Sequence, residues 1–126
     1  MKMNELTKII IDCAIEVHRT LGGPGLLESV YEEALVWELK NRRLSVLKQV
    51  YLPIHYKGSP LGTTLRIDIM VNKMVIVECK ATEQMDKLFQ SQLLTYLRVS
   101  GLRVGLLLNF GQTLMKDGIY RVINGF

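Results

Sequence analysis

Two acidic residues and a lysine stand in one of the most apolar parts of the sequence. Asp68 lies within residues 66–69, and Glu78 and Lys80 lie within residues 75–80. Side chains alternate between the two faces of a strand, so Glu78 and Lys80 would share a face with Ile76. Because buried charges are costly unless they are paired or bound to a metal, we expect this segment to do chemistry as well as to fold.

A hairpin closed by residues 72–74 would place Asp68 opposite Glu78 and Arg66 opposite Lys80. Opposed side chains lie on the same face about 5 Å apart, so the two carboxylates could hold one cation between them. This metal-site interpretation predicts a three-residue loop or a bulge, because a two-residue loop would turn Asp68 to the other face. The alternative is a structural ion-pair ladder, in which Arg66 and Lys80 neutralise the two acids. Opposed carboxylates repel without a cation, which favours the metal.

Composition indicates one domain over residues 1–126, since 126 residues with 48% hydrophobic content can form a substantial core. No window approaches 18 uninterrupted apolar residues, and the N-terminal pattern is amphipathic. We therefore expect a soluble cytoplasmic protein with no membrane association. Cys13 and Cys79 both fall at apolar-facing positions, which favours reduced core thiols over a disulfide.

The net charge of +4 is unevenly distributed. Residues 1–38 hold three bases and seven acids, a net charge of −4, whereas residues 39–126 hold thirteen bases and five acids, a net charge of +8. A basic C-terminal two-thirds around an acidic pair suits a polyanionic substrate, such as nucleic acid, approaching a bound cation.

Hydrophobic periodicity predicts two N-terminal helices, the first over residues 5–20 with Asn4 as cap and Gly22 as stop, the second from Leu26 or Leu27 to residues 41–43. Strands are expected at 46–56, 65–71, 75–80, 103–109 and 119–123, with a turn at 57–62 and a helix at 85–99. Pro53 suggests an edge position or a bulge for the first strand. This order predicts an α/β sandwich with a central mixed sheet.

These residues resemble a known family. Asp68 followed ten positions later by Glu78-Cys79-Lys80, on the second and third strands of such a core, resembles the PD-(D/E)XK nuclease superfamily, with Ile67 where a proline often stands. Residues 25–31 match the signature of the small bacterial GxxExxY family, which residues 92–97 and 109–111 also resemble. The resemblance implies a nuclease-like α/β/α sandwich preceded by two N-terminal helices, and metal-dependent hydrolysis of phosphodiester bonds, with DNA favoured over RNA as the substrate.

The resemblance also implies that Glu28 completes a metal site from its helix, beside Asp68, Glu78 and the backbone carbonyl of Cys79. Such hard oxygen ligands suit Mg²⁺ or Mn²⁺. Lys80 would position the attacking water or stabilise the developing charge. The alternative for Glu28 is a favourable acid near a helix N-terminus.

Gln92 shares a helical stripe with Leu88, Tyr96 and Val99, so it is a polar group on a mostly apolar surface that needs partners. It either bonds a neighbouring backbone group, or orients Lys80, a metal-bound water or the phosphate as part of the catalytic set. Tyr31 either hydrogen-bonds the site or belongs to the core. Tyr96 is expected to support the site.

Two other function classes stay open. A catalytically silent module would bind nucleic acid or a partner protein but no metal, and an assembly protein would show an apolar patch and obligate oligomerisation. The complete set of Asp68, Glu78 and Lys80 argues against both. A homodimer is compatible with the sequence.

Overall fold

The computed structural model describes residues 1–125, in which a mixed five-stranded sheet has the order β1-β2-β3-β4-β5. The strands β3 and β4 are parallel, and every other neighbouring pair is antiparallel. The predicted order of elements and the mixed sheet are therefore confirmed. The strands are β1 (Val46–Tyr56), β2 (Ser59–Val71), β3 (Val75–Lys80), β4 (Val104–Asn109) and β5 (Ile119–Ile123), with a short 3₁₀ turn η1 (Met115–Gly118) before β5.

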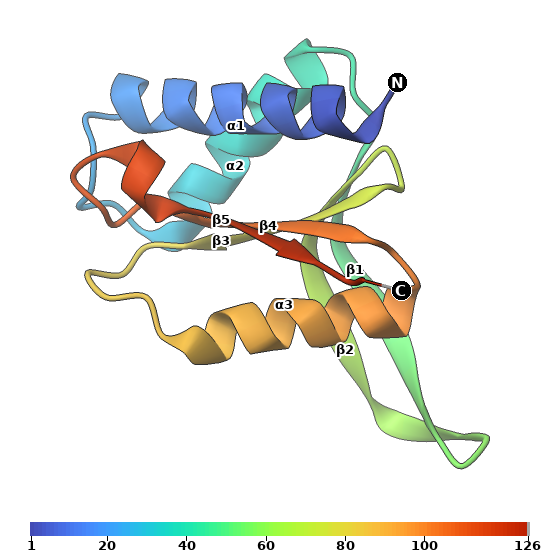
Figure 1. The fold of residues 1–126 in the computed structure, drawn as a ribbon. Coiled ribbons are helices and arrows are strands. Elements are labelled where there is room, and N and C mark those ends of the chain that lie inside the picture. Colours follow the sequence, from blue (N-terminus) through green and yellow to red (C-terminus); the bar gives the residue numbers. More distant parts are fainter. Residues whose placement is uncertain (126) are drawn as a thin grey trace.

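Helices cover both faces of the sheet (Figure 1). The helices α1 (Met3–Thr20) and α2 (Glu28–Asn41) pack on one face over the larger part of the core, and α3 (Lys87–Ser100) packs on the other. The alternation of β3 explains the division, since its odd-numbered residues join the larger cluster and Ile76 joins the smaller one. The predicted α/β/α sandwich is thus observed. No helix in residues 1–125 is long and apolar enough to span a membrane.

The two N-terminal helices differ from prediction at their starts. The first begins at Met3 after Lys2, so Asn4 lies inside it and is not its cap. It ends at Thr20, and Gly22 adopts the positive φ of 88° expected of a stop residue. The helix α2 begins at Glu28, later than predicted. Glu28 is therefore the first helical residue of α2.

The strands β1 and β2 form a ribbon longer than predicted. The expected turn over 57–62 is wrong, because only Lys57 and Gly58 separate the strands and both have positive φ, as a tight two-residue hairpin turn requires. The strand β1 is an edge strand, and its register shifts between Pro53 and His55, which confirms both expectations for Pro53. Figure 1 shows the ribbon projecting past α3.

The hairpin from β2 to β3 has the predicted three-residue loop. Val71 pairs with Val75 across the loop of residues 72–74, and the ladder continues to Ile69 and Val77. The next residue on each strand is one of the two predicted acids. The hydrogen-bonded ladder ends where these acids begin, so the strands can separate at the site.

Helix α3 presents a different face to the core than the sequence suggested. Its buried residues are Leu93 and Leu97, while Leu88 is 65% exposed and Val99 is 41% exposed. The prediction that Gln92 faces a mostly apolar surface is therefore wrong, and Gln92 is exposed. Successive helical residues are separated by about 100°, so a buried line through 93 and 97 leaves 88, 92 and 99 on its solvent side.

Candidate functional site

Asp68 and Glu78 lie side by side where β2 and β3 separate. Each carboxylate bonds the backbone of the opposite strand: Glu78 Oε1 accepts from the Asp68 N–H, and Asp68 Oδ2 accepts from the Cys79 N–H, both at 3.3 Å. Both acids are buried, with 7% of their surface exposed. The predicted hairpin register, which places the two carboxylates together, is therefore confirmed.

The neighbouring bases do not neutralise this pair. Within residues 1–125, no nitrogen of Arg66 or Lys80 lies within 4.0 Å of an Asp68 or Glu78 carboxylate oxygen. Lys8 instead pairs with Asp12, and Arg19 with Glu16, on the exposed surface of α1. The structural ion-pair ladder is absent, so the buried acids need another source of compensation.

Without a bound cation, protonation of Glu78 removes one of the two buried negative charges. Burial raises the pKa of Glu78 to about 9, and the adjacent Asp68 carboxyl adds to the rise, while the Asp68 N–H and Lys80 oppose it. Glu78 is consequently held in its neutral form near pH 7. A bound divalent cation would favour the charged form instead, so the pair has the electrostatic character of a cation site.

A cavity of about 290 Å³ opens over the pair. It brings together residues from α2, β2, β3 and α3, that is, from segments up to 68 positions apart in the chain. Six predicted site residues line it, and Cys79 and Tyr31 do not. The lining residues are Glu28, Thr64, Leu65, Arg66, Asp68, Glu78, Lys80, Gln92 and Tyr96.

Glu28 enters this cavity from the first turn of α2. Burial raises the pKa of Glu28, and Asp68 adds to the rise, while Lys80 and Arg66 oppose it. In the part of the chain that the structure describes, no three His, Cys, Asp or Glu side chains are close enough together to hold a metal ion. Glu28 thus shares the cavity with the acidic pair without completing a three-carboxylate cluster.

The backbone of Cys79 faces the strand that carries Asp68. Its N–H points toward Asp68, and in an extended strand the N–H and the C=O of one residue face the same neighbouring strand. The carbonyl of Cys79 therefore lies on the β2 side of β3, and its thiol is buried among core residues. Cys13 and Cys79 are both free thiols.

Lys80 is held by α3 rather than by the acids. Its Nζ lies 4.3 Å from the centroid of the Phe89 ring, a cation–π distance. This contact keeps the ammonium at the mouth of the cavity without pairing it to a carboxylate. Phe89 was not predicted as a site residue. Its only signal in the sequence is its place three positions before Gln92, on the same side of the helix.

Gln92 and Tyr96 lie one turn apart at the cavity. Gln92 makes no hydrogen bond with any residue in the range 1–125, so the backbone-bonded alternative is not observed. Burial, Glu78 and Asp68 together raise the pKa of Tyr96, which places its hydroxyl within the field of the acidic pair. Both side chains therefore offer polar groups that can hydrogen-bond to a ligand in the cavity.

Tyr31 belongs to the core. Its hydroxyl donates to the Gly23 carbonyl at 2.7 Å and accepts from the Leu26 N–H at 3.1 Å, so it bonds the loop before α2 and not the carboxylates. Its ring stacks on Phe110, with centroids 4.8 Å apart. Tyr31 thus fixes the loop from which α2 begins, and with it the position of Glu28.

Two further residues near the acids were missed. Glu32 lies one turn beyond Glu28; burial raises the pKa of Glu32, with Asp68 as the next cause. Gln49 donates to Glu32 Oε1 at 2.8 Å, while its own Oε1 is buried without a partner in the part of the chain that the structure describes. The i, i+4 spacing of the two glutamates was a readable signal. Nothing local marks Gln49, whose positive φ of 53° interrupts β1 opposite Asp68.

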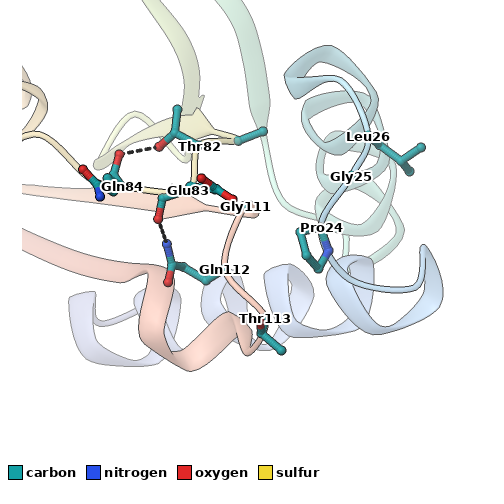
Figure 2. Close-up of a pocket in the computed structure, with 10 residues that line it drawn as sticks. Pro24, Gly25, Leu26, Thr82, Glu83, Gln84, Gly111, Gln112 and Thr113 are labelled. Carbon is teal, nitrogen blue, oxygen red and sulfur yellow. Dashed lines mark hydrogen bonds between the residues drawn. The ribbon is translucent and has the colours of Figure 1, made fainter.

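A larger cavity of about 730 Å³ lies just beyond the ends of β3 and β4 (Figure 2). Figure 2 shows its polar groups bonding one another: the Thr82 hydroxyl donates to the Gln84 carbonyl, and the Gln112 amide donates to the Glu83 carbonyl. Glu83 is its one acidic lining residue. This cavity lacks the paired carboxylates and the lysine, so the smaller one is the candidate site.

Comparison with known proteins yields one finding. The family model for the PD-(D/E)XK nuclease superfamily matches residues 4–122, which include every residue that lines the smaller cavity. No curated protein and no solved structure matches the chain.

Proposed function

Because the chain belongs to the PD-(D/E)XK nuclease superfamily, whose members generally hydrolyse phosphodiester bonds, we propose that it is a metal-dependent nuclease acting on DNA. One observation carries the proposal: Asp68 and Glu78 are buried side by side with no ion-pair partner among residues 1–125, in a cavity that Lys80 also lines. If these positions served only the stability of the fold, well-packed apolar side chains would stabilise it as well or better.

A divalent cation fits this donor set. Asp68 and Glu78 would hold it, together with the Cys79 carbonyl, and Glu28 would reach it from α2 by a change of rotamer. All four groups are hard oxygen donors, which favours Mg²⁺ or Mn²⁺ over Zn²⁺. Bound there, the ion would lower the pKa of water and offset charge on the phosphate oxygens.

The other residues at the cavity have separate roles in this proposal. Lys80, restrained by Phe89, would position the attacking water and stabilise negative charge that develops on the phosphate. Gln92 would orient the same water or a phosphate oxygen with its free amide. Tyr96 would donate its hydroxyl proton in a hydrogen bond to the acidic pair and so support their orientation.

We further propose that the chain belongs to the GxxExxY family within this superfamily. The placement of the motif supports this, since Gly25 has a φ of 118° in the loop that Tyr31 anchors, and Glu28 begins the next helix at the cavity. The net charge of +8 over residues 39–126 supports a nucleic-acid substrate, and DNA is favoured. A bacterial source, a cytoplasmic location and a homodimer stay predictions.

One observation favours a second candidate, a catalytically silent module that binds nucleic acid or a protein. No three potential ligand side chains in residues 1–125 form a metal-sized cluster. If Glu28 cannot swing toward the pair, two carboxylates and a carbonyl would be the whole protein contribution. Metal affinity separates the two candidates.

A cleavage assay tests the proposal. Purified protein is incubated with single- and double-stranded DNA and RNA in Mg²⁺ or Mn²⁺, with EDTA as the metal-free condition. DNA cleavage that requires the metal and disappears in Glu78→Ala is the expected result. The matched control is Glu33→Ala, which removes an exposed acid from the outer side of α2 and should cleave normally. Equal behaviour of wild type and Glu78→Ala across all substrates would favour the silent module.

A further inference from the structure

The β1–β2 ribbon extends well beyond the sheet. The strand β2 pairs with β3 only from Ile69 onward, so residues 50–67, here called the ribbon arm, are joined to the rest of the sheet only through their base. One side of the arm rests on the α3 layer, where Val50 and Leu52 pack around Ile67. The opposite side is exposed, and the tip stands clear of the domain (Figure 1).

The arm lies in a stretch of unbalanced charge. Between Glu38 and Asp68 the sequence contains six basic residues and no acid. Two of the six, Lys57 at the tip and Arg66 near the site, belong to the arm and are exposed. The arm itself therefore carries cations and no carboxylate, which suits contact with a polyanion.

Exposed aromatic rings accompany these charges. Tyr51 is 64% exposed and Tyr56 is 62% exposed, on strands where a tyrosine normally buries its ring against the sheet. Lys57 Nζ lies 5.5 Å from the centroid of the Tyr56 ring. Rings placed beside cations on an open surface are the arrangement with which proteins stack bases and hold the adjoining phosphates.

The arm is connected to the candidate site through register. Tyr51 pairs directly with Arg66, so their side chains share one face of the ribbon, and Arg66 lines the cavity over Asp68 and Glu78. Arg66 therefore links the exposed ring of Tyr51 to the cavity of the acidic pair. From Tyr51 the same strand runs roughly 17 Å to Tyr56 at the tip.

We propose that the ribbon arm binds a single strand of nucleic acid and leads it into the site. Tyr51 stacks on an unpaired base, Arg66 contacts the phosphate next to the one that is cleaved, and Tyr56 and Lys57 hold the strand farther out. Stacking of this kind requires bases that are not already paired, which separates a single strand from a duplex. The inference rests on the proposed nuclease function and specifies its substrate.

Binding without metal tests the arm independently of catalysis. A fluorescently labelled 20-nucleotide DNA, an RNA of the same sequence and the corresponding DNA duplex are titrated by anisotropy in EDTA at several salt concentrations. Tyr51→Ala should weaken single-strand binding roughly tenfold without changing its salt dependence, and Tyr51→Phe should bind normally. Lys57→Ala should reduce the slope of log affinity against log salt by about 0.7, as loss of one phosphate contact predicts.

Two matched controls lie on α2, away from the arm. Trp37→Ala removes an aromatic ring that is also 64% exposed, and Lys40→Ala removes an exposed cation. Both should bind as wild type does. The single strand that binds more tightly, DNA or RNA, identifies the substrate.

Each contrary result is distinct. Arm variants that bind like the controls, or a duplex that binds more tightly than either single strand, would overturn the arm proposal and leave the nuclease intact. Arm-dependent binding without cleavage would support the arm and overturn the nuclease. A wild-type protein that neither binds nor cleaves nucleic acid would overturn both.

Discussion

The Asp68 backbone donates a hydrogen bond to the Glu78 carboxylate at 3.3 Å, in the position where the ladder between β2 and β3 would otherwise continue. The reciprocal bond runs from the Cys79 N–H to Asp68. Each acid is thus held by the strand that carries the other. This exchange keeps two carboxylates adjacent although they repel when charged, and it supplies the donors that buried carboxylates need.

Replacing Asp68 by asparagine should leave the melting temperature in EDTA unchanged or raised. The amide oxygen can still accept from the Cys79 N–H, and removal of the Asp68 charge, which raises the pKa of Glu78, lowers the free-energy cost of burying Glu78. Thermal unfolding monitored by circular dichroism measures this, with Asp117→Asn as the exposed control. If a buried cation depended on Asp68, the substitution would instead cost about 3–5 kcal/mol, and the melting temperature would fall sharply.

The metal-free protein should lose stability as the pH rises from about 5 to 9. Burial and Asp68 raise the pKa of Glu78 from 4.5 to about 9, so the folded state binds this proton more tightly than the unfolded state. Deprotonation between those values therefore opposes folding, by at most about 1.4 kcal/mol per pH unit for one group. Urea unfolding in EDTA at pH 6, 7, 8 and 9 measures the slope. Glu78→Gln should flatten it, and an equal slope in that variant would exclude Glu78 as its source.

Lys80→Ala should lower the rate of DNA cleavage by roughly a hundredfold or more, while Mn²⁺ affinity stays unchanged. An ammonium cannot ligate a cation, so its removal affects the reacting groups and not metal binding. Lys80→Arg should not restore full activity, because a planar, delocalised guanidinium does not replace a compact ammonium charge beside the reacting groups. Cleavage rates and calorimetric titration with Mn²⁺ give the two readouts. Loss of metal binding in Lys80→Ala would instead place this residue in the structure of the site.

Glu28→Gln should weaken Mn²⁺ binding by at least about tenfold if the first residue of α2 reaches the ion. The control is Glu33→Gln on the exposed side of the same helix, which should bind normally. Calorimetry on both variants decides. Unchanged affinity in Glu28→Gln would restrict the protein ligands to the acidic pair and the Cys79 carbonyl, as the absence of a three-residue cluster in the described chain suggests.

Tyr31→Phe should cost about 1 kcal/mol of folding free energy and lower cleavage activity without changing the core. The ring can still stack on Phe110, but the bonds to Gly23 and Leu26 are lost and the start of α2 is less restrained. Urea unfolding and cleavage rates measure the two effects. Tyr51→Phe, at an exposed tyrosine, should leave stability unchanged. A fully active Tyr31→Phe variant would show that Glu28 needs no such anchor.

The sequence by itself determined the register of the site. Period-two alternation and the three-residue loop are local properties of the chain, and they place Asp68 beside Glu78 without reference to anything distant. The same local rules supplied the order of the elements, the mixed sheet and the edge position of β1 with its irregularity at Pro53.

Only the tertiary structure decided what surrounds the pair. That Lys80 rests on Phe89, that Gln49 bonds Glu32, and that Tyr31 bonds a loop all depend on how α2 and α3 pack on the two faces of the sheet. Likewise, the sequence pattern placed Gln92 on a helix face with Leu88, Tyr96 and Val99 that was expected to be buried. In the structure α3 buries Leu93 and Leu97 instead, and Gln92 lies on the exposed side. How elements distant in sequence pack depends on the apolar area that the whole chain can bury, which no local pattern specifies. The alternation that places Asp68 beside Glu78 follows from the geometry of the strand itself.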